Sequence, residues 1–180
     1  MPLKIIKADT SYTAAITSIG KKSFRETFGH LFSSREYLFE YLEYTYNPVK
    51  IAKSIRKENN VYFVAMLEDM PVGFVKVKMN SLHSQIESIA QMELQKIYVL
   101  PEHHGAGAGT ALLNAALKLA REVCPDYLWL DTHTSNSKAI RFYEKNGFRK
   151  AGNHYFTIGT QTFEYYLMTL HVAINEPCHC

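Results

Sequence analysis

Apolar residues recur along the first third of the chain at spacings of three and four, which is the period of amphipathic helices. A short strand over Lys4–Ala8 precedes a predicted helix that Asp9, Thr10 or Ser11 can cap and that runs toward Gly29. A second helix is expected from Ser33 or Ser34 until Pro48 ends it, with a further short helix over Val49–Lys57. The N-terminal third therefore reads as one strand followed by three helices.

The rest of the chain alternates between β-rich runs and helical patterns. Val61–Leu67 and Val72–Lys78 are joined by residues of turn composition and predict a hairpin, whereas Ser81–Ala90 has no period and predicts a loop. The remaining pattern predicts strands over Met92–Val99, Tyr127–Thr132, Phe148–His154 and Phe163–Thr169, and helices over Gly107–Arg121 and Ser137–Asn146. We interpret this order as a mixed α/β layer in one domain over residues 1–172, with 173–180 as a flexible tail.

Composition narrows the classes of function. The chain has 180 residues, of which 47% are hydrophobic, so it can bury one good core. Its formal net charge is only +3 and its basic and acidic residues are interspersed, which argues against a nucleic-acid partner. No segment has the character of a signal peptide or a membrane span, and three cysteines are an odd number for a disulfide framework. We therefore expect a cytoplasmic protein with no membrane partner.

The C-terminal Cys178-His179-Cys180 could bind a soft metal ion. Two thiols and one imidazole at a chain end lack a fixed fourth ligand, so we expect no metal site.

The clearest chemical signal is the glycine-rich segment His104–Gly109, which reads HGAGAG. It follows a predicted strand and opens a predicted helix. A pyrophosphate needs outward-facing backbone N–H groups, a helix N-terminus behind them and no side chains in the way. Gly105, Gly107 and Gly109 meet these needs, so the segment predicts a pyrophosphate cradle.

Two other phosphate motifs compete for this segment. The ATPase P-loop is excluded because Gly109 is followed by Thr110-Ala111 and not by a lysine. The dinucleotide fingerprint would need a third glycine at Thr110, although Asp131 ends the next strand at a suitable place. A Rossmann-like binder therefore stays open as an alternative.

At these residues the chain resembles a known family. The segment Leu94–Leu113, with His104, Gly107 and Gly109, resembles the acetyl-coenzyme A motif of the GNAT family of N-acetyltransferases, in which glutamine or arginine usually stands at the position of His104. Downstream, Asn136–Phe148 looks like the family's second conserved segment. The resemblance covers Val61–Leu170, and Phe24–Phe28 looks most like the bacterial branch that includes polyamine N-acetyltransferases.

The resemblance implies a fold and a cosubstrate. The fold would be α/β (α+β), with a mixed, mostly antiparallel twisted sheet of about seven strands that is flanked by helices and splayed at its central strands. The cosubstrate would be acetyl-coenzyme A. Its contacts would come from the main chain of the splayed strand, the glycine-rich segment and the start of the later helix: Ile97, Val99, His104, Gly105, Ala106, Gly107, Ala108, Gly109, Thr110 and Asn136.

The resemblance also implies direct attack of an amine on the thioester. Tyr143 stands at the position of the tyrosine that protonates the leaving thiolate, although packing against its apolar neighbours would also explain it. Glu93 stands where several members place a catalytic glutamate, and the alternatives are an exposed strand-end glutamate or a water relay. His133 is a second candidate base, and Asn136 could contact the cofactor, cap its helix or do both.

The acceptor is the least specified part. Glu36, Glu40 and Glu43 share one helix face and could attract a polyamine such as spermidine or spermine, but a solvated helix face explains them as well. A small amine is the expected partner, and a peptide or protein acceptor stays open, as does a noncatalytic acyl-coenzyme A or nucleotide sensor. The oligomeric state is expected to be a monomer or a homodimer.

Overall fold

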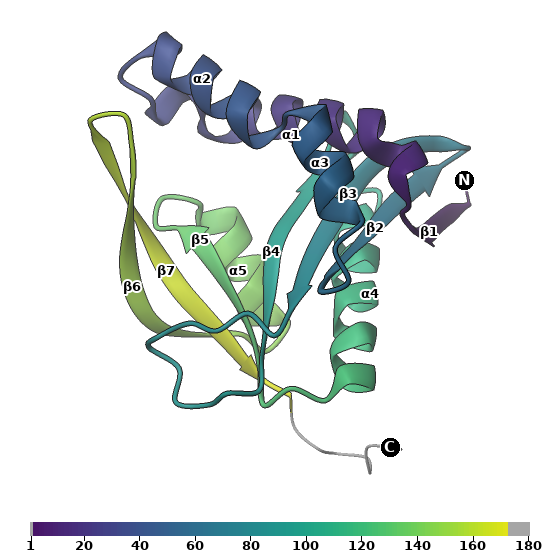
Figure 1. The fold of residues 1–180 in the computed structure, drawn as a ribbon, viewed down its shortest axis with the longest axis vertical. Coiled ribbons are helices and arrows are strands. Elements are labelled where there is room, and N and C mark those ends of the chain that lie inside the picture. The colour runs from purple at the N-terminus through teal and green to yellow at the C-terminus, as the bar shows by residue number, and fades with distance from the viewer. Residues whose placement is uncertain (1, 173–180) are drawn as a thin grey trace. The chain divides into compact units, whose positions relative to one another are not determined.

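The computed structural model describes residues 2–172 (Figure 1). By contacts within the chain it divides into two compact units. Unit 1 comprises residues up to 77 together with 96–116, and unit 2 comprises 78–95 together with the residues from 117 onward. The expectation of a single domain over residues 1–172 stays a prediction, and the proposed tail at 173–180 lies outside the described residues.

Unit 1 holds the N-terminal strand, the first helices, the hairpin and the start of the fourth α-helix. Its strands are β1 (Leu3–Lys7), β2 (Asn60–Leu67), β3 (Met70–Met79) up to Val77, and the second part of β4 (Gln91–Val99). Its α-helices are α1 (Thr13–Phe28), α2 (Arg35–Thr45), α3 (Pro48–Ile55) and the first part of α4 (Ala108–Val123). Short 3-10 turns lie at Thr10–Tyr12, Gly29–Leu31 and Pro101–His103. The helix starts follow capping chemistry, because the side chains of Ser34 and Asn47 accept hydrogen bonds from the first turns of α2 and α3.

Alternation along β3 separates two packed layers of unit 1. Phe74 belongs to an apolar cluster with residues of α1, α2, α3 and β2. A β-carbon on the neighbouring Gly73 would lie 3.2 Å from Leu112 of α4 and 2.8 Å from the carbonyl oxygen of Tyr98. Because successive residues of a strand face opposite sides, α1–α3 cover one face of these strands and α4 lies against the other. Gly73 allows the close approach of β3 and β4 that this packing requires.

Unit 2 holds the remaining elements. These are the first part of β4, β5 (Tyr127–His133), α5 (Ser137–Lys145), β6 (Arg149–Ile158) and β7 (Gln161–His171), with the end of α4 (Figure 1). β5 pairs in parallel with β4 from Gln91–Tyr127 to Glu93–Trp129, and it pairs antiparallel with β7 along its whole length. The seven strands described form one sheet in the order β1-β2-β3-β4-β5-β7-β6.

The register of unit 2 places specific side chains on one face of its sheet. Glu93 pairs with Trp129, Asp131 pairs with Leu167, and His154 pairs with Tyr165. Since directly paired residues face the same side, Glu93, Asp131 and His154 share a face. The β6–β7 register shifts between Lys150 and Gly152, so β6 carries one extra residue there, which is a β-bulge. Without that shift His154 would point to the opposite face.

The predicted element order is confirmed, and the boundaries differ by a few residues. The hairpin turns at Glu68 and Asp69, both at positive φ, and the predicted loop over 81–90 contains no helix or strand. β6 and β7 each extend beyond the predicted ranges, because hairpin pairing continues past the apolar core into exposed residues. The expected α/β (α+β) fold with a seven-stranded, mostly antiparallel sheet flanked by helices is confirmed. Among the described residues, no helix has the length and apolar character to cross a membrane.

Candidate functional site

The glycine-rich segment forms an open loop at the start of α4 in unit 1. Gly105 and Gly107 have φ of 86° and 82°, a region that side chains with a β-carbon rarely adopt. A β-carbon at either position would meet nothing within 4 Å, so the loop backbone is open to a ligand. The first helical hydrogen bond runs from the Ala111 N–H to the Gly107 carbonyl at 3.0 Å, and the N–H groups of residues 108–110 precede it. The arrangement suits an anion such as a pyrophosphate.

The end of β4 presents its main chain on the edge away from β3. The Leu100 N–H donates to the Val72 carbonyl of β3 at 2.8 Å. Because N–H and C=O groups of a strand alternate between its two edges, those of Ile97 and Val99 point the other way. These are the two residues predicted to contact the cofactor through their main chain, and that contact stays a prediction.

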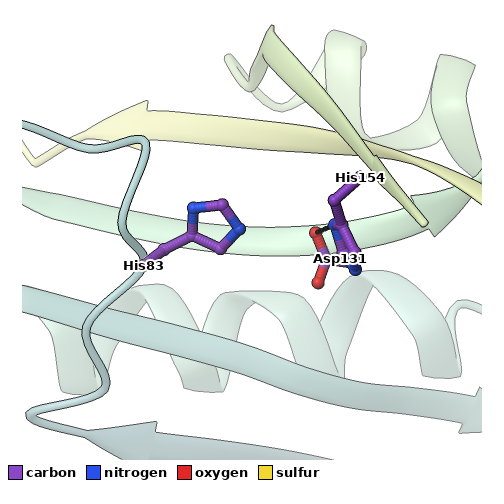
Figure 2. Close-up of side chains that lie close together, drawn as sticks. All are labelled: His83, Asp131 and His154. Atoms are coloured by element: carbon purple, nitrogen blue, oxygen red, sulfur yellow. Dashed lines mark ion pairs between the residues drawn. The ribbon is translucent and has the colours of Figure 1, made fainter. Parts of the chain in front are cut away.

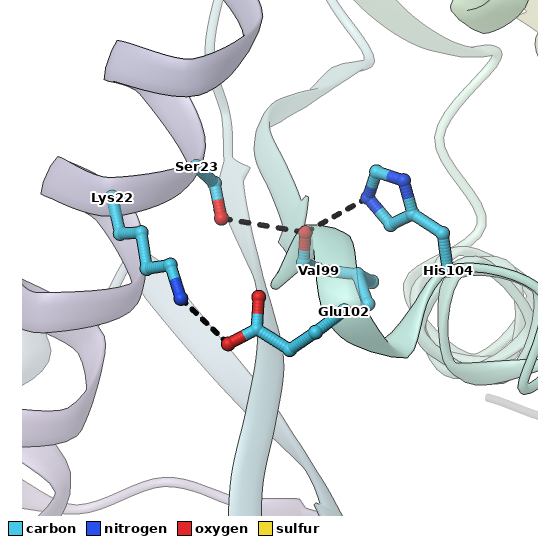
Figure 3. Close-up of polar contacts among 5 residues, drawn as sticks. All are labelled: Lys22, Ser23, Val99, Glu102 and His104. Atoms are coloured by element: carbon cyan, nitrogen blue, oxygen red, sulfur yellow. Dashed lines mark hydrogen bonds and ion pairs between the residues drawn. The ribbon is translucent and has the colours of Figure 1, made fainter.

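His104 anchors the glycine-rich loop to β4. Its Nε2 lies 3.0 Å from the Val99 carbonyl oxygen, which also accepts a hydrogen bond from the Ser23 hydroxyl at 3.3 Å (Figure 3). Only a protonated Nε2 can donate to a carbonyl, so this contact selects that tautomer. The histidine at the position of the usual glutamine or arginine thus ties the loop to the strand before it.

An ion pair lies beside this anchor. Lys22 Nζ of α1 is 2.6 Å from Glu102 Oε1 (Figure 3). Their hydrogen bond raises the pKa of Lys22 and lowers the pKa of Glu102. Both side chains are substantially exposed, so the pair orients residue 102 and adds little to stability.

Glu93, the predicted base, lies on the first part of β4 in unit 2. Its Oε2 accepts hydrogen bonds from the Ser81 hydroxyl at 2.8 Å and from the Gln95 amide at 3.4 Å. The side chain is half-buried, so it is neither a freely solvated strand-end residue nor a core residue. Its predicted role as a base stays a prediction.

A cluster that the sequence did not predict lies on the same sheet face as Glu93. His83, Asp131 and His154 each place one ligand atom within 4.8 Å of the others, and His154 Nδ1 is 3.1 Å from Asp131 Oδ1 (Figure 2). Burial, together with the negative charge of Glu93, raises the pKa of Asp131 to about 7, although 27% of its side-chain surface still meets solvent. Burial lowers the pKa of both histidines. The histidines are therefore neutral at pH 7, and the cluster contains no permanent cation to balance the carboxylate of Asp131.

The buried amide of Gln91 holds the loop that carries His83. Gln91 is 2% exposed, and its Oε1 accepts a hydrogen bond from the His83 N–H at 2.7 Å. Its Nε2 lies within hydrogen-bond distance of the carbonyls of Ile86 and Ser88, at 3.2 and 2.5 Å. The indole N–H of Trp129 also donates to the Ser81 carbonyl at 2.8 Å. A loop without regular structure is thus held by buried side-chain donors and acceptors.

Tyr143 and Asn136, the predicted site residues of α5, both have structural contacts in unit 2. Tyr143 is buried, its ring centroid lies 5.7 Å from that of Phe148, and burial raises its pKa. The Asn136 side chain accepts a hydrogen bond from the Ala139 N–H at 3.1 Å and caps α5. The packing and capping interpretations are therefore confirmed, and the catalytic and cofactor roles stay predictions.

His133, the second candidate base, also takes part in local structure. Its Nδ1 accepts a hydrogen bond from the Ser135 N–H at 3.1 Å, and its ring lies edge-on to Tyr165 at 5.4 Å. The structure thus brings the predicted cradle residues together in unit 1 and leaves Glu93, Asn136 and Tyr143 in unit 2. Strand alternation alone could have placed Asp131 on the same strand face as Trp129, but nothing local in the sequence marked His83 or His154.

The model of the acetyltransferase (GNAT) family matches residues 22–148 of the chain, which is more than half of it. The chain belongs to this family. It is therefore an enzyme of the N-acetyltransferase type, as the resemblance implied. The expected membership of a polyamine-specific branch stays a prediction.

Individual GNAT relatives extend the likeness over the described chain. An uncharacterized N-acetyltransferase of Lactobacillus delbrueckii subsp. lactis is 24% identical over 157 residues, covering 87% of this chain and 90% of the relative. The crystal structure of the PaiA N-acetyltransferase of Thermoplasma acidophilum in complex with coenzyme A has a TM-score of 0.77 at 22% identity, covering 95% and 99% of the two chains. That of the ribosomal-protein-S18-alanine N-acetyltransferase of Escherichia coli has a TM-score of 0.71 at 19% identity, covering 98% and 97%. The two structures show the GNAT fold.

Replacing Gln91 by leucine should loosen the loop over residues 81–90. The substitution keeps the volume roughly constant but leaves the His83 N–H and the Ile86 and Ser88 carbonyls without their partner. We expect faster amide hydrogen exchange in this loop and a loss of about 1–3 kcal/mol in the free energy of unfolding. Gln95→Leu is the control, because Gln95 lies on the same strand outside that network; equal exchange in the two variants would contradict the role of Gln91.

Proposed function

We propose that this GNAT enzyme transfers an acetyl group from acetyl-coenzyme A to a primary amine by direct attack in a ternary complex. The observation that carries the proposal is the open glycine-rich loop at the start of α4, with two glycines at positive φ and first-turn N–H groups ahead of the first helical bond. Residues His104–Thr110 would hold the pyrophosphate. The coenzyme A named in the complex of the PaiA relative supports this cosubstrate.

The residues around the loop fit a long cosubstrate with a peptide-like arm. Ile97 and Val99 present main-chain groups on the strand edge away from β3, so we propose that they pair with the pantetheine amides. The Val99 carbonyl already accepts two hydrogen bonds, so its N–H is the group we assign to this contact. Asn136 is proposed to contact the cofactor from its place at the start of α5. No metal enters this chemistry; the thioester itself supplies the electrophilic carbonyl.

Two proton transfers accompany the reaction. The amine must lose a proton before it attacks, and the departing thiolate must gain one. We propose Glu93 as the group that receives the amine proton, directly or through water, because it is half-buried and held in place by Ser81 and Gln95. We propose Tyr143 as the proton donor to the thiolate; its raised pKa keeps it protonated at neutral pH.

The finer proposal concerns the acceptor, for which a polyamine is our first candidate. Glu36 and Glu40 of α2 are exposed on one helix face and could attract a second cationic group. Glu43 on that face is already paired with Lys21 at 2.7 Å, and Lys50 covers the ring of Tyr44, so the attraction would come from two carboxylates. A peptide N-terminus is the second candidate, because an N-alpha-acetyltransferase of Sulfurisphaera tokodaii is 28% identical over 116 residues, covering 61% of this chain and 70% of that relative. We further propose that the enzyme acts in the cytoplasm as a monomer or homodimer.

Gly107→Ala should weaken acetyl-coenzyme A binding without unfolding the protein. A β-carbon at a φ of 82° costs about 1–2 kcal/mol, so we expect a roughly 5- to 30-fold higher Kd by calorimetry. Gly159→Ala is a matched control, because Gly159 is also at positive φ, in the turn between β6 and β7. An unchanged Kd in Gly107→Ala would contradict the cradle.

The unsubstituted protein, given acetyl-coenzyme A with spermidine, spermine, amino acids or peptides, should release free thiol with at least one amine. Cofactor binding with no thiol release from any amine would favour a sensor.

Tyr143→Phe should slow the chemical step and spare cofactor binding. Loss of a general acid lowers kcat by about 100-fold, whereas the ring that packs on Phe148 is retained. Single-turnover thiol release measures the step, and the melting temperature checks that packing survives. An unchanged rate would leave Tyr143 with its packing role alone.

Glu93→Gln should flatten the pH dependence of kcat/KM. The substitution keeps the side-chain volume and removes the group that gains the amine proton. We therefore expect loss of the rise in kcat/KM with pH that reports ionisation of the base, and a fall in kcat/KM of about 100-fold. Glu122→Gln, at an exposed glutamate of α4, is the matched control and should leave the profile unchanged. An unaltered pH profile would assign deprotonation to water, and a profile that changes in Asp131→Asn instead would move the role to Asp131.

A further inference from the structure

The acetyl transfer proposed above assigns no role to the cluster of His83, Asp131 and His154. It lies entirely in unit 2 and draws its three side chains from the 81–90 loop, β5 and β6. Two imidazoles and one carboxylate form the ligand set of many mononuclear transition-metal sites. The cluster therefore differs in composition from the glycine-rich loop, which belongs to unit 1.

We propose that His83, Asp131 and His154 form a binding site for a divalent transition-metal ion of the Zn²⁺ class. The inference goes beyond the acetyltransferase activity and does not depend on it. With three protein ligands, the ion would keep at least one coordination position for water or another small ligand.

The distances suit this assignment. Zinc binds histidine nitrogen and carboxylate oxygen at about 2.0–2.2 Å, which places neighbouring ligand atoms of a tetrahedral ion roughly 3.4 Å apart. His154 Nδ1 and Asp131 Oδ1 are already 3.1 Å apart, and no separation within the cluster exceeds 4.8 Å. Closure around an ion thus requires side-chain adjustments of about 1 Å. His83, on a loop, is the ligand best able to make them.

His154 presents a nitrogen that the described protein does not satisfy. Its Nδ1 is inaccessible to solvent and, among residues 2–172, has no hydrogen-bond partner. The 3.1 Å approach to Asp131 is an ion-pair distance and not a hydrogen bond in its geometry. A buried nitrogen without a partner costs free energy, and coordination of its lone pair would remove that cost.

The charges around the cluster favour a cation. Glu93 and Asp131 share the sheet face, and the imidazole of His154 lies against both Asp131 and the ring of His83. A divalent ion would place positive charge beside these two carboxylates.

Supporting contacts already orient the ligands. Gln91 fixes the backbone of His83, and the His154 ring stacks on Tyr165 at 5.7 Å. His83 Nδ1 accepts a hydrogen bond from the Gln85 N–H at 3.2 Å, and the ring extends toward Asp131 (Figure 2). Coordination through the other ring nitrogen would shift the ring proton to Nδ1, and the exposed Gln85 N–H would then bond to water. The pre-set positions reduce the ordering that an ion must impose.

The single tryptophan of the chain provides the readout. Trp129 is the only tryptophan of the sequence, and its ring centroid lies 5.0 Å from that of His83. Co²⁺ is a paramagnetic substitute for Zn²⁺ that quenches nearby fluorescence and gives visible absorption bands that depend on its ligands. Because Cys178, His179 and Cys180 could also bind such ions, the titration uses full-length protein carrying Cys178→Ser, His179→Gln and Cys180→Ser.

In that protein Co²⁺ should bind at one equivalent, quench Trp129 and be displaced by Zn²⁺. Asp131→Asn and His154→Gln should each raise the Kd for Co²⁺ at least tenfold while the melting temperature of the metal-free protein is kept. His171→Gln, an exposed histidine of β7, is the matched control and should bind as the parent does.

Deletion of Ala151 is a second test, because it removes the extra residue of the bulge and moves His154 to the opposite face. A folded deletion variant should lose the Co²⁺ site. Equal Kd values in parent, Asp131→Asn and His154→Gln would overturn the proposal. So would a parent that binds no Co²⁺ while spermidine alone changes Trp129 fluorescence, since that result would assign the cluster to an alkylammonium group. Neither result depends on acetyl transfer, which the thiol-release assay measures separately.

Discussion

The arrangement of unit 2 depends on the burial of one carboxamide. The backbone N–H and C=O groups of a ten-residue loop without helix or strand still need hydrogen-bond partners. In this protein the buried side chain of Gln91, the first residue of β4, bonds to several of them. In this loop, the Ser81 hydroxyl donates a hydrogen bond to Glu93, and the Ser81 carbonyl accepts one from the Trp129 indole. The loop also carries His83, which lies in the cluster with Asp131. One buried polar side chain thus fixes the positions of groups that otherwise share no secondary structure.

The glycine-rich loop of unit 1 depends on neighbouring residues and not on a distant side chain. Its conformation is local, because glycines at positive φ and a helix start lie within a few residues of each other. The sequence therefore predicted it well, together with the strand before it and the helix after it. What the sequence could not predict is the contact from His104 to the Val99 carbonyl, since that contact depends on how the chain reverses through the 3-10 turn at Pro101–His103.

The same contrast separates the predicted and unpredicted parts of the whole chain. Helix caps at Ser34 and Asn136, the hairpin turn and the order of elements are short-range properties, and the pattern of residues indicated them. The grouping of Glu93, Asp131 and His154 is a property of strand register between segments that are distant in sequence. Tyr143 shows a further limit, because a buried tyrosine on an apolar helix face has the same pattern whether it packs, donates a proton or does both.

The bulge between Lys150 and Gly152 affects how this chain should be compared with its relatives. Side chains on β6 beyond the bulge are out of phase with those of a relative that lacks the extra residue. An alignment drawn without a gap there would match His154 to residues on the opposite side of the sheet in such relatives. Insertion or deletion of one residue can therefore move the histidine to or from this face during divergence, and counts of substitutions do not record such an event.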